Sequence, residues 1–437
     1  MDTTDTICAL ATPPGTGAIA AIRLAGKEAF QIGNSVFKPA NSSISLDRAK
    51  SHTIHFGTIQ DEDDLIDEVL VSVFRSPTSY TGEDVLEISC HGSPYIQQRI
   101  IQLLLKKGAR TARPGEFTLR AFLNGKFDLS QAEAVADLIA SNSKYSHDLA
   151  LEQMRGGFSE KIRNLRQELV NFASLIELEL DFSEEDVEFA DRNKIIELLQ
   201  NLRKEIEGLL KSFSVGNVLK NGIPVAIIGK PNVGKSTLLN TILQEEKAIV
   251  SEIPGTTRDS IEDTIIIEGI AFRFIDTAGL RVSEDEVESI GIERTMEKIK
   301  QARIILFVFD VTGSDVEQVK EVLEEHRHLI EDPKKRIILI GNKIDQLIEI
   351  PKGFKDLVEL ETIFISAKRK ENINLISDSL LKSVNTEQIS DNTIVSNVRH
   401  YEALSKSLDA IEDVEDGFQR QIPSDLIAID IRKALHH

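Results

Sequence analysis

The sequence predicts a multidomain protein in which an N-terminal α+β domain precedes a helical bundle, and an α/β domain is inserted between the helices of that bundle. Three observations predict this arrangement. The chain has 437 residues, which is too long for one hydrophobic core. Short β-rich runs give way to helical spacing near residue 119, and strand–helix alternation fills residues 220–384. Helical spacing then returns, so the predicted segments are residues 1–118, 119–219, 220–384 and 385–437.

The first segment is predicted to be a small α+β domain. Runs such as "GAIAAIRLAG" and "DVLEISCHG" have strand composition and alternate with turns marked by Pro and Gly. The run "YIQQRIIQLLLKKGA" has the spacing of an amphipathic helix. Cys90 and His91 are neighbours in a predicted strand, where adjacent side chains point to opposite faces. We therefore interpret Cys90 as a structural residue rather than a nucleophile.

Three apolar stripes predict the helical bundle. Apolar residues recur at spacings of three and four within residues 158–176, 195–213 and 398–411. A single amphipathic helix cannot bury its own stripe, so we expect these segments to pack together. The third stripe follows the α/β segment, which should therefore be an insertion. Such insertions are tolerated because the termini of a domain often lie close together.

Composition limits the class of protein. The net charge of −20 repels polyanions, so a nucleic acid must be met by a local basic patch or a partner. Arg110, Arg113, Arg120 and Lys126 are one candidate patch, and a solvated face is the other interpretation. Two cysteines argue against a disulfide framework or a zinc site. With no secretory signal and no apolar run of the roughly 18 residues that a membrane span needs, we expect a cytoplasmic protein.

A phosphate-binding turn is predicted at residues 229–236 (GKPNVGKS), which follow a buried strand pattern and open a helix. Glycines in such a turn let backbone N–H groups converge on a phosphate. Lys235 then supplies charge to the β- and γ-phosphates, and the Ser236 hydroxyl can ligate Mg²⁺. The sequence therefore predicts a nucleoside triphosphate site.

Three further motifs at predicted strand ends identify the nucleotide. Residues 276–279 (DTAG) can hold Mg²⁺ through water and sense the γ-phosphate. In residues 342–345 (NKID) the carboxylate can accept hydrogen bonds from guanine N1–H and the 2-amino group, which adenine does not offer. Residues 366–368 (SAK) would present a backbone N–H to guanine O6. The four motifs in this order predict GTP rather than ATP, and a P-loop (Ras-like) G domain.

The hydrolytic mechanism should differ from that of Ras-like switches, which place a glutamine directly after the DTAG-type turn to orient water. Here that position is Leu280, which cannot orient water. Glu284, Glu286 and Glu288 in the following acidic segment are the candidates, and a solvated loop is the alternative.

The preceding loop, residues 251–259 (SEIPGTTRD), offers Thr256 or Thr257 to complete the Mg²⁺ shell. No arginine of this loop is obviously aimed at the transition state, and Arg258 is the one candidate. A monovalent cation held by Asn232 and by loop carbonyls could supply the missing positive charge.

The whole sequence resembles the MnmE (TrmE) family of bacterial and organellar tRNA-modification GTPases. The resemblance rests on "TPPGTGAIAAIRLAG", "YTGEDVLEISCHGS", "RPGEFTLRAFLNGKFDLSQAEAVADLI", "GKPNVGKSTLLN", "PGTTRD" and "DTAGLRVSEDEVESIGIER". It implies a homodimer formed through the N-terminal domain and a heterotetramer with the flavoprotein MnmG (GidA). It also implies addition of a carboxymethylaminomethyl or aminomethyl group at C5 of the wobble uridine of certain tRNAs. The one-carbon donor would be 5,10-methylene- or 5-formyl-tetrahydrofolate.

The resemblance implies roles for individual residues. Glu288 matches the family's catalytic glutamate, and Ser236 and Thr257 match its Mg²⁺ ligands. The matching K⁺ ligands are Asn232, Ser251, Ile253 and Thr256. The complete set expected at the nucleotide is Asn232, Val233, Gly234, Lys235, Ser236, Thr237, Ser251, Glu252, Ile253, Pro254, Gly255, Thr256, Asp276, Thr277, Ala278, Gly279, Asn342, Lys343, Ile344, Asp345, Ser366, Ala367 and Lys368.

The folate contacts implied by the resemblance are Arg23, Glu87 and Lys126, which on sequence pattern alone look like surface residues. Family members end in a Cys-Ile-Gly-Lys tail, whereas this sequence ends in "IRKALHH", and we expect GTP hydrolysis not to need the tail. Two alternatives stay open. One is a ribosome-assembly GTPase of the Era or Der kind, and the other is a folate-dependent aminomethyltransferase whose G domain only regulates it.

Overall fold

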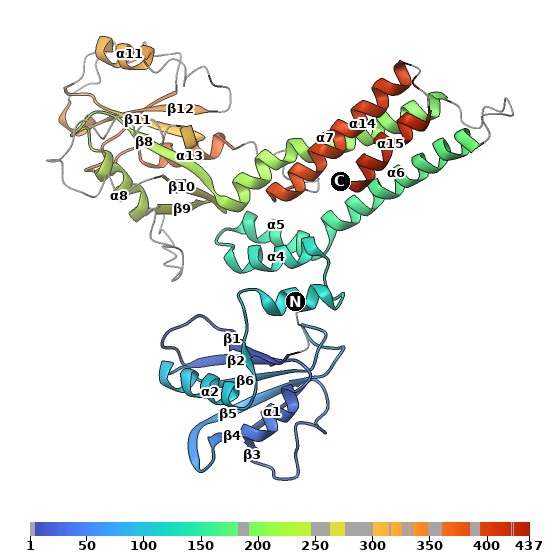
Figure 1. Cartoon of the computed structure of the whole chain (residues 1–437). Coiled ribbons are helices and arrows are strands. Elements are labelled where there is room, and N and C mark those ends of the chain that lie inside the picture. Colours follow the sequence, from blue (N-terminus) through green and yellow to red (C-terminus); the bar gives the residue numbers. More distant parts are fainter. Residues whose placement is uncertain are drawn as a thin grey trace. The chain divides into compact units, whose positions relative to one another are not determined.

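The structure, a computed structural model, consists of two compact units (Figure 1). Unit 1 comprises Met1–Ala136 and Met154–Ser159, and unit 2 comprises Asp137–Gln153 and Glu160–His437. The predicted fold class is confirmed, while the four predicted segment boundaries stay predictions. The described residues are 5–181, 192–245, 263–275, 300–313, 316–325, 332, 335–347, 361–384, 394–420, 422 and 424–437.

Unit 1 is built on a seven-stranded sheet with the spatial order β3-β4-β5-β6-β2-β1-β7. Helices α1 (Ala29–Val36) and α2 (Pro94–Lys106) share one hydrophobic core with alternate strand residues such as Ile22 and Ile88. Because side chains alternate along a strand, the residues next to them lie on the opposite face. The strands are β1 (Ile7–Leu10), β2 (Ile19–Ala25), β3 (Phe37–Pro39), β4 (Thr53–Asp61), β5 (Asp64–Phe74), β6 (Val85–His91) and β7 (Arg110–Thr111), and α3 (Glu116–Leu123) follows β7.

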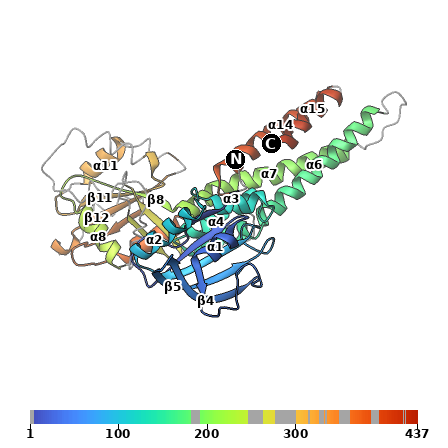
Figure 2. The ribbon, with the colours of Figure 1, turned by 60° about the horizontal axis from the view of Figure 1, so that its bottom comes forward.

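The predicted bundle is present in unit 2, where long helices run alongside one another (Figure 2). The rings of Phe172 and Phe418 lie 6.2 Å apart and join the first and third predicted helices. Arg203 pairs with Glu415 at 3.0 Å and joins the second to the third. The helices are α4 (Leu129–Ala140), α5 (Lys144–Met154), α6 (Gly157–Asp181), α7 (Arg192–Asn221), α14 (Val398–Gln419) and α15 (Ser424–His436), although the first residues of α4 and α6 belong to unit 1.

One part of the predicted third stripe is wrong. Val398 is 56% exposed, although it belongs to the predicted apolar face of α14. Tyr401 is 37% exposed, but its ring lies 4.6 Å from that of Phe213 in α7, as the predicted packing requires. The buried face instead includes Ser407 and Ala410, whose small side chains allow α15 to approach closely. Ser407 Oγ donates a hydrogen bond to the Ala434 carbonyl at 3.2 Å. A pattern that counts large apolar residues misses this packing.

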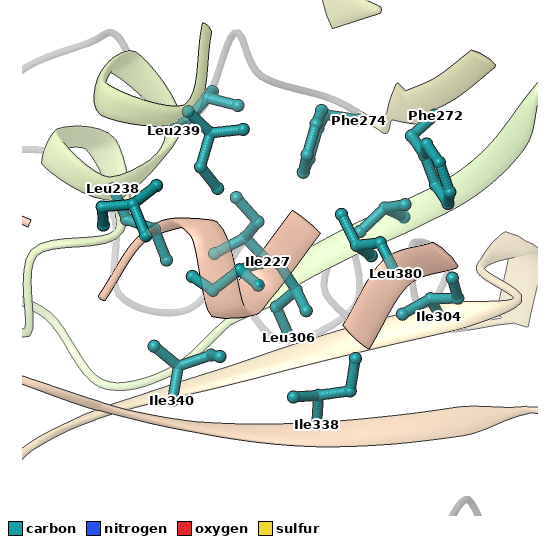
Figure 3. Packing of buried hydrophobic residues seen from close by; sticks show 14 of the residues in the cluster. Ile227, Leu238, Leu239, Phe272, Phe274, Ile304, Leu306, Ile338, Ile340 and Leu380 are labelled. Atoms are coloured by element: carbon teal, nitrogen blue, oxygen red, sulfur yellow. The ribbon is translucent and has the colours of Figure 1, made fainter. Parts of the chain in front are cut away.

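The inserted domain is a six-stranded sheet of order β13-β12-β11-β8-β10-β9. Five strands are parallel as predicted, whereas β9 (Asp263–Ile267) is an antiparallel edge strand that the sequence pattern missed. Leu238 and Leu239 from one helix and Leu380 from another lie over the apolar strand residues (Figure 3). The parallel strands are β8 (Ile223–Ile228), β10 (Ile270–Phe274), β11 (Ile304–Asp310), β12 (Arg336–Asn342) and β13 (Glu361–Phe364); the helices are α8 (Lys235–Glu245), α11 (Val316–Glu325) and α13 (Asn374–Lys382).

None of the helices in the described part of the chain is both long and apolar enough to cross a bilayer.

Candidate functional site

The predicted phosphate-binding turn joins the end of β8 to the start of α8. Gly229 and Gly234 have φ values of 151° and 95°, which favour glycine. A Cβ on Gly229 would lie 2.1 Å from the Val308 carbonyl oxygen, and one on Gly234 would lie 2.4 Å from Asn342 Nδ2. Asn232 has φ 60°, a left-handed conformation that Asn tolerates better than most residues. The shape of the turn therefore requires glycine at positions 229 and 234 and is compatible with Asn232.

Lys235 folds back over this turn. Its Nζ donates hydrogen bonds to the carbonyl oxygens of Gly229 at 3.0 Å and Lys230 at 2.7 Å. Ser236 and Thr237 follow in the first turn of α8, and both side chains are exposed. An anion at this helix start meets the free N–H groups and the positive end of the helix dipole. The arrangement is suited to a phosphate chain.

Asn342 joins three of the predicted motifs. Its side-chain Nδ2 donates to the Val233 carbonyl in the phosphate-binding turn at 2.8 Å. Its Oδ1 accepts from the Ala367 backbone N–H at 3.0 Å, which engages an amide of the SAK motif. The side chain is 3% exposed, so losing either bond would leave a buried polar group unsatisfied. Asn342 thus holds the three motifs at one end of the sheet.

Asp345 is oriented by a neighbouring motif. The Ser366 hydroxyl donates to Asp345 Oδ1 at 2.7 Å and itself accepts from the Arg369 N–H at 3.1 Å. Ser366 is fully buried, so the surrounding residues restrict rotation of its side chain. This contact fixes the carboxylate plane and leaves its second oxygen for another donor. A guanine base has two donors on one edge, which suits such a carboxylate.

Lys343 is fixed by an ion pair with Asp310, whose Oδ2 lies 2.6 Å from Lys343 Nζ. Burial tends to raise the pKa of the Asp310 carboxyl, but hydrogen bonds from Lys343 and Thr312 outweigh it, and the pKa is lowered. The carboxylate therefore stays ionised and holds the lysine stem at the edge of the candidate base pocket.

Of the remaining predicted nucleotide residues, Ile344 is half-buried and Lys368 is exposed. The others lie outside the described residues. These are Ser251, Glu252, Ile253, Pro254, Gly255, Thr256, Thr257, Asp276, Thr277, Ala278, Gly279 and Glu288. Within the described ranges, no group of three or more His, Cys, Asp or Glu is placed to hold a metal ion. An expected Mg²⁺ ligand set of hydroxyl groups and phosphate oxygens does not require such a group.

Two of the three predicted folate contacts meet in unit 1. Arg23 and Glu87 are directly opposite on β2 and β6, and their side chains pair at 2.6 Å. The Arg23 guanidinium lies 5.0 Å from the Tyr80 ring and 5.3 Å from the Phe117 ring. These two aromatic residues were missed as site residues, although both lie within the sequence runs that carry the family resemblance.

The third predicted contact, Lys126, is exposed, and its Nζ donates to the Pro77 carbonyl at 3.1 Å. The ring of the adjacent Phe127 lies 5.7 Å from the Tyr80 ring, which links this turn to the Arg23 cluster. These residues thus place aromatic rings and both positively and negatively charged side chains on one side of unit 1.

The prediction of a basic patch in unit 1 is wrong for Arg120. Arg120 is 1% exposed and pairs with Asp5, Glu83 and Glu116. Arg110 pairs with the same Asp5 and with Glu116, each at 2.6 Å. These acids lie far from the arginines in sequence, except Glu116, so the sequence pattern could not reveal the pairing. Both arginines are therefore part of an ion network, and Arg120 is too deeply buried to contact a nucleic acid.

Comparison with known proteins identifies the family. Residues 6–126 match the family model "GTP-binding protein TrmE N-terminus", and residues 129–437, more than half of the chain, match "MnmE helical domain". The tRNA modification GTPase MnmE of Flavobacterium psychrophilum is 55% identical over 435 residues, covering 99% of this chain and 94% of that protein. The protein of the same name from Flavobacterium johnsoniae is 56% identical over 438 residues, with the same coverage.

Among solved structures, Aquifex aeolicus Era bound to GDP and AlF4⁻ is similar at 27% identity with a TM-score of 0.29, covering 43% of this chain and 66% of that one. The two family models and the full-length relatives agree. The chain belongs to the MnmE family of tRNA modification GTPases.

Proposed function

We propose that this chain is a K⁺-dependent GTPase that acts in tRNA modification. The observation that carries the proposal is the Asn342 bridge, which ties the phosphate-binding turn to the SAK motif through hydrogen bonds of 2.8 and 3.0 Å. Asp345, held by Ser366 at 2.7 Å, supports selection of guanine. Asp345 is half-buried, and leaving its carboxylate without donors disfavours adenine.

In this proposal Lys235 and the N–H groups of the turn bind the β- and γ-phosphates. Ser236 and Thr257 would hold Mg²⁺, which supplies charge stabilisation on the phosphates when bound. Glu288 orients the attacking water in place of the glutamine of Ras-like switches. Asn232, Ser251, Ile253 and Thr256 would hold K⁺, and their oxygens suit a hard cation.

We further propose that unit 1 binds a one-carbon tetrahydrofolate, 5,10-methylene- or 5-formyl-tetrahydrofolate, through Arg23, Glu87 and Lys126. The Arg23–Glu87 pair and the Tyr80 ring support this, because a pterin is flat and carries both donors and acceptors. The chain would act in the cytoplasm as a homodimer, together with the flavoprotein MnmG, and modify C5 of the wobble uridine.

The GTPase proposal is tested by the hydrolysis rate in KCl and in NaCl at equal ionic strength. We expect at least a several-fold higher rate in K⁺, because a cation of that size replaces an arginine at the transition state. Asn232→Ala should remove the preference. Asn240→Ala, which alters an exposed asparagine of α8, is the matched control and should retain it.

Nucleotide affinity is measured for both variants, so that weaker binding is separated from slower chemistry. Equal wild-type rates in the two salts would rule out the cation mechanism. Unequal rates that survive Asn232→Ala would instead rule out Asn232 as a ligand.

A further inference from the structure

The inserted domain and the end of α7 together form a polar cavity, at the end of the sheet opposite the candidate nucleotide site. Its volume is about 450 Å³, and its lining includes Asn217, Asn221, Pro224, Arg273, Gln301 and Arg303. Pro224 and Arg303 lie at the amino ends of β8 and β11, whereas the phosphate-binding turn follows the carboxyl end of β8. In Figure 1 the end of α7 leads directly into β8 beside this region.

The two arginines flank Pro224 in one row across the sheet. Arg273 of β10 is the register partner of Pro224, and the Arg303 N–H donates to the Pro224 carbonyl at 2.9 Å on the other side. Residues at one level of neighbouring strands point to the same face, and each step across the sheet is about 4.8 Å. Two long cationic side chains therefore stand either side of a short proline ring, which leaves space between them.

The rest of the lining adds neutral polar groups. Asn217 and Asn221 lie one turn apart at the end of α7, and Asn221 Nδ2 donates to Asn217 Oδ1 at 2.6 Å. Among the described residues that line the cavity, none carries a carboxylate. Both arginines are partly buried. Two guanidinium groups thus share the lining of one cavity with two asparagines, in a chain with a net charge of −20.

This arrangement fits an oxyanion with several oxygens. A guanidinium binds two oxygens through parallel N–H donors, so one carboxylate is saturated by one arginine. A phosphate offers oxygens to two arginines at once. The volume is within the range of ligand pockets.

We propose that this cavity binds a phosphate group between Arg273 and Arg303, with Asn217 as a neutral partner. The phosphate can come from an RNA backbone or from a small phosphorylated molecule. In the RNA case the inference rests on the proposed role in tRNA modification. The cavity would then provide a contact to RNA that the net negative charge of the chain otherwise disfavours. In the small-molecule case it is independent of that role.

The test uses the full chain saturated with GDP and Mg²⁺, so that added phosphate does not enter the nucleotide site. One arm measures anisotropy of a labelled RNA stem–loop over a salt series, and the other measures heat on titration with inorganic pyrophosphate. The variants are Arg303→Gln and the double variant Arg273→Gln/Arg303→Gln. Arg166→Gln, an exposed arginine of α6 outside the cavity, is the matched control.

If the phosphate belongs to RNA, Arg303→Gln should weaken RNA binding roughly tenfold and reduce the slope of log K against log salt by about 1. If it belongs to a small molecule, the variant should lose the pyrophosphate heat and leave RNA binding unchanged. Arg166→Gln should change neither. Wild-type values in both arms for the double variant would overturn the proposal.

GDP binding reports folding of each variant. If Arg303→Gln does not bind GDP, Arg303→Lys takes its place, because it keeps the charge and loses the paired donors. Arg303→Lys should then weaken binding of whichever ligand responds, RNA or pyrophosphate, by less than the double variant does. Wild-type binding of that ligand by Arg303→Lys would also overturn the proposal. Neither arm measures GTP hydrolysis, so failure here is distinguishable from failure of the K⁺ experiment.

Discussion

Asp345 is the residue on which base selection depends. Ser366 Oγ donates to Asp345 Oδ1 at 2.7 Å, and in the proposed function the second carboxylate oxygen accepts from the base. In Asp345→Asn the Oδ1 contact is retained and an NH₂ group replaces the second oxygen. That group donates to the 2-oxo oxygen of xanthine but meets the donor groups of guanine. We expect nucleotide preference to shift from GTP to XTP by at least tenfold, measured as the ratio of dissociation constants.

Asp378→Asn is the matched control, because Asp378 is an exposed carboxylate of α13 in the same domain. It should leave the preference for GTP intact. An Asp345→Asn variant that still prefers GTP would show that the base is read elsewhere.

At the scale of elements, the Arg110–Arg120 network joins four segments of unit 1: the chain just before β1, strand β7, helix α3 and the loop before β6. Hydrogen bonding from Arg110 lowers the pKa of Glu116 to about 2, from an ordinary value of 4.5. A depressed carboxyl pKa stabilises the fold above the unfolded pKa, and that contribution is lost as pH falls toward the folded pKa. Stability should therefore decline between pH 4.5 and 2.

We expect the melting temperature, measured by calorimetry, to fall less steeply over this range in Glu116→Gln than in the wild type. Glu83→Gln is the control with the opposite sign, because burial raises the pKa of Glu83. In that variant the melting temperature should not fall less steeply with decreasing pH than in the wild type. An unchanged slope in Glu116→Gln would mean that the network does not stabilise the fold.

Elements with local signals could be predicted from the sequence, while those fixed by distant partners could not. The five parallel strands and the helices α6, α7 and α14 carry their periodicity within themselves. The phosphate-binding turn is likewise a local pattern. In contrast, burial of Arg120 depends on Asp5, which is 115 residues away, and the role of Asn342 depends on Val233, 109 residues away. Among the described strands, the edge strand β9 pairs with β10 alone, and Gly269 of the turn between them is the one local signal that the sequence interpretation did not use.

At the scale of the whole molecule, candidate folate residues and candidate nucleotide residues belong to different compact units. Arg23, Glu87 and Lys126 are in unit 1, and all the nucleotide motifs are in unit 2. Each ligand should therefore stabilise its own unit, because a ligand that binds only the native state adds free energy in proportion to the logarithm of its concentration.

The two cysteines report on unit 1 alone. Cys8 is fully buried and Cys90 is 3% exposed, and burial raises the pKa of each thiol to about 11. At pH 8 both are protonated and inaccessible, so a thiol reagent should react only when unit 1 opens. At about 100 times its dissociation constant, GDP should stabilise unit 2 by about 2.7 kcal/mol.

We therefore expect GDP to raise the temperature of the calorimetric transition of unit 2. The temperature at which the thiols react should be the same with and without GDP. A one-carbon tetrahydrofolate should do the reverse and delay thiol reaction. Ser236→Ala, which weakens Mg²⁺ and phosphate binding, should reduce the GDP shift and leave the folate shift intact. If GDP delays thiol reaction by the same temperature interval as it shifts unit 2, the units unfold as one. Nucleotide state would then be coupled to the candidate folate site through the stability of the fold itself.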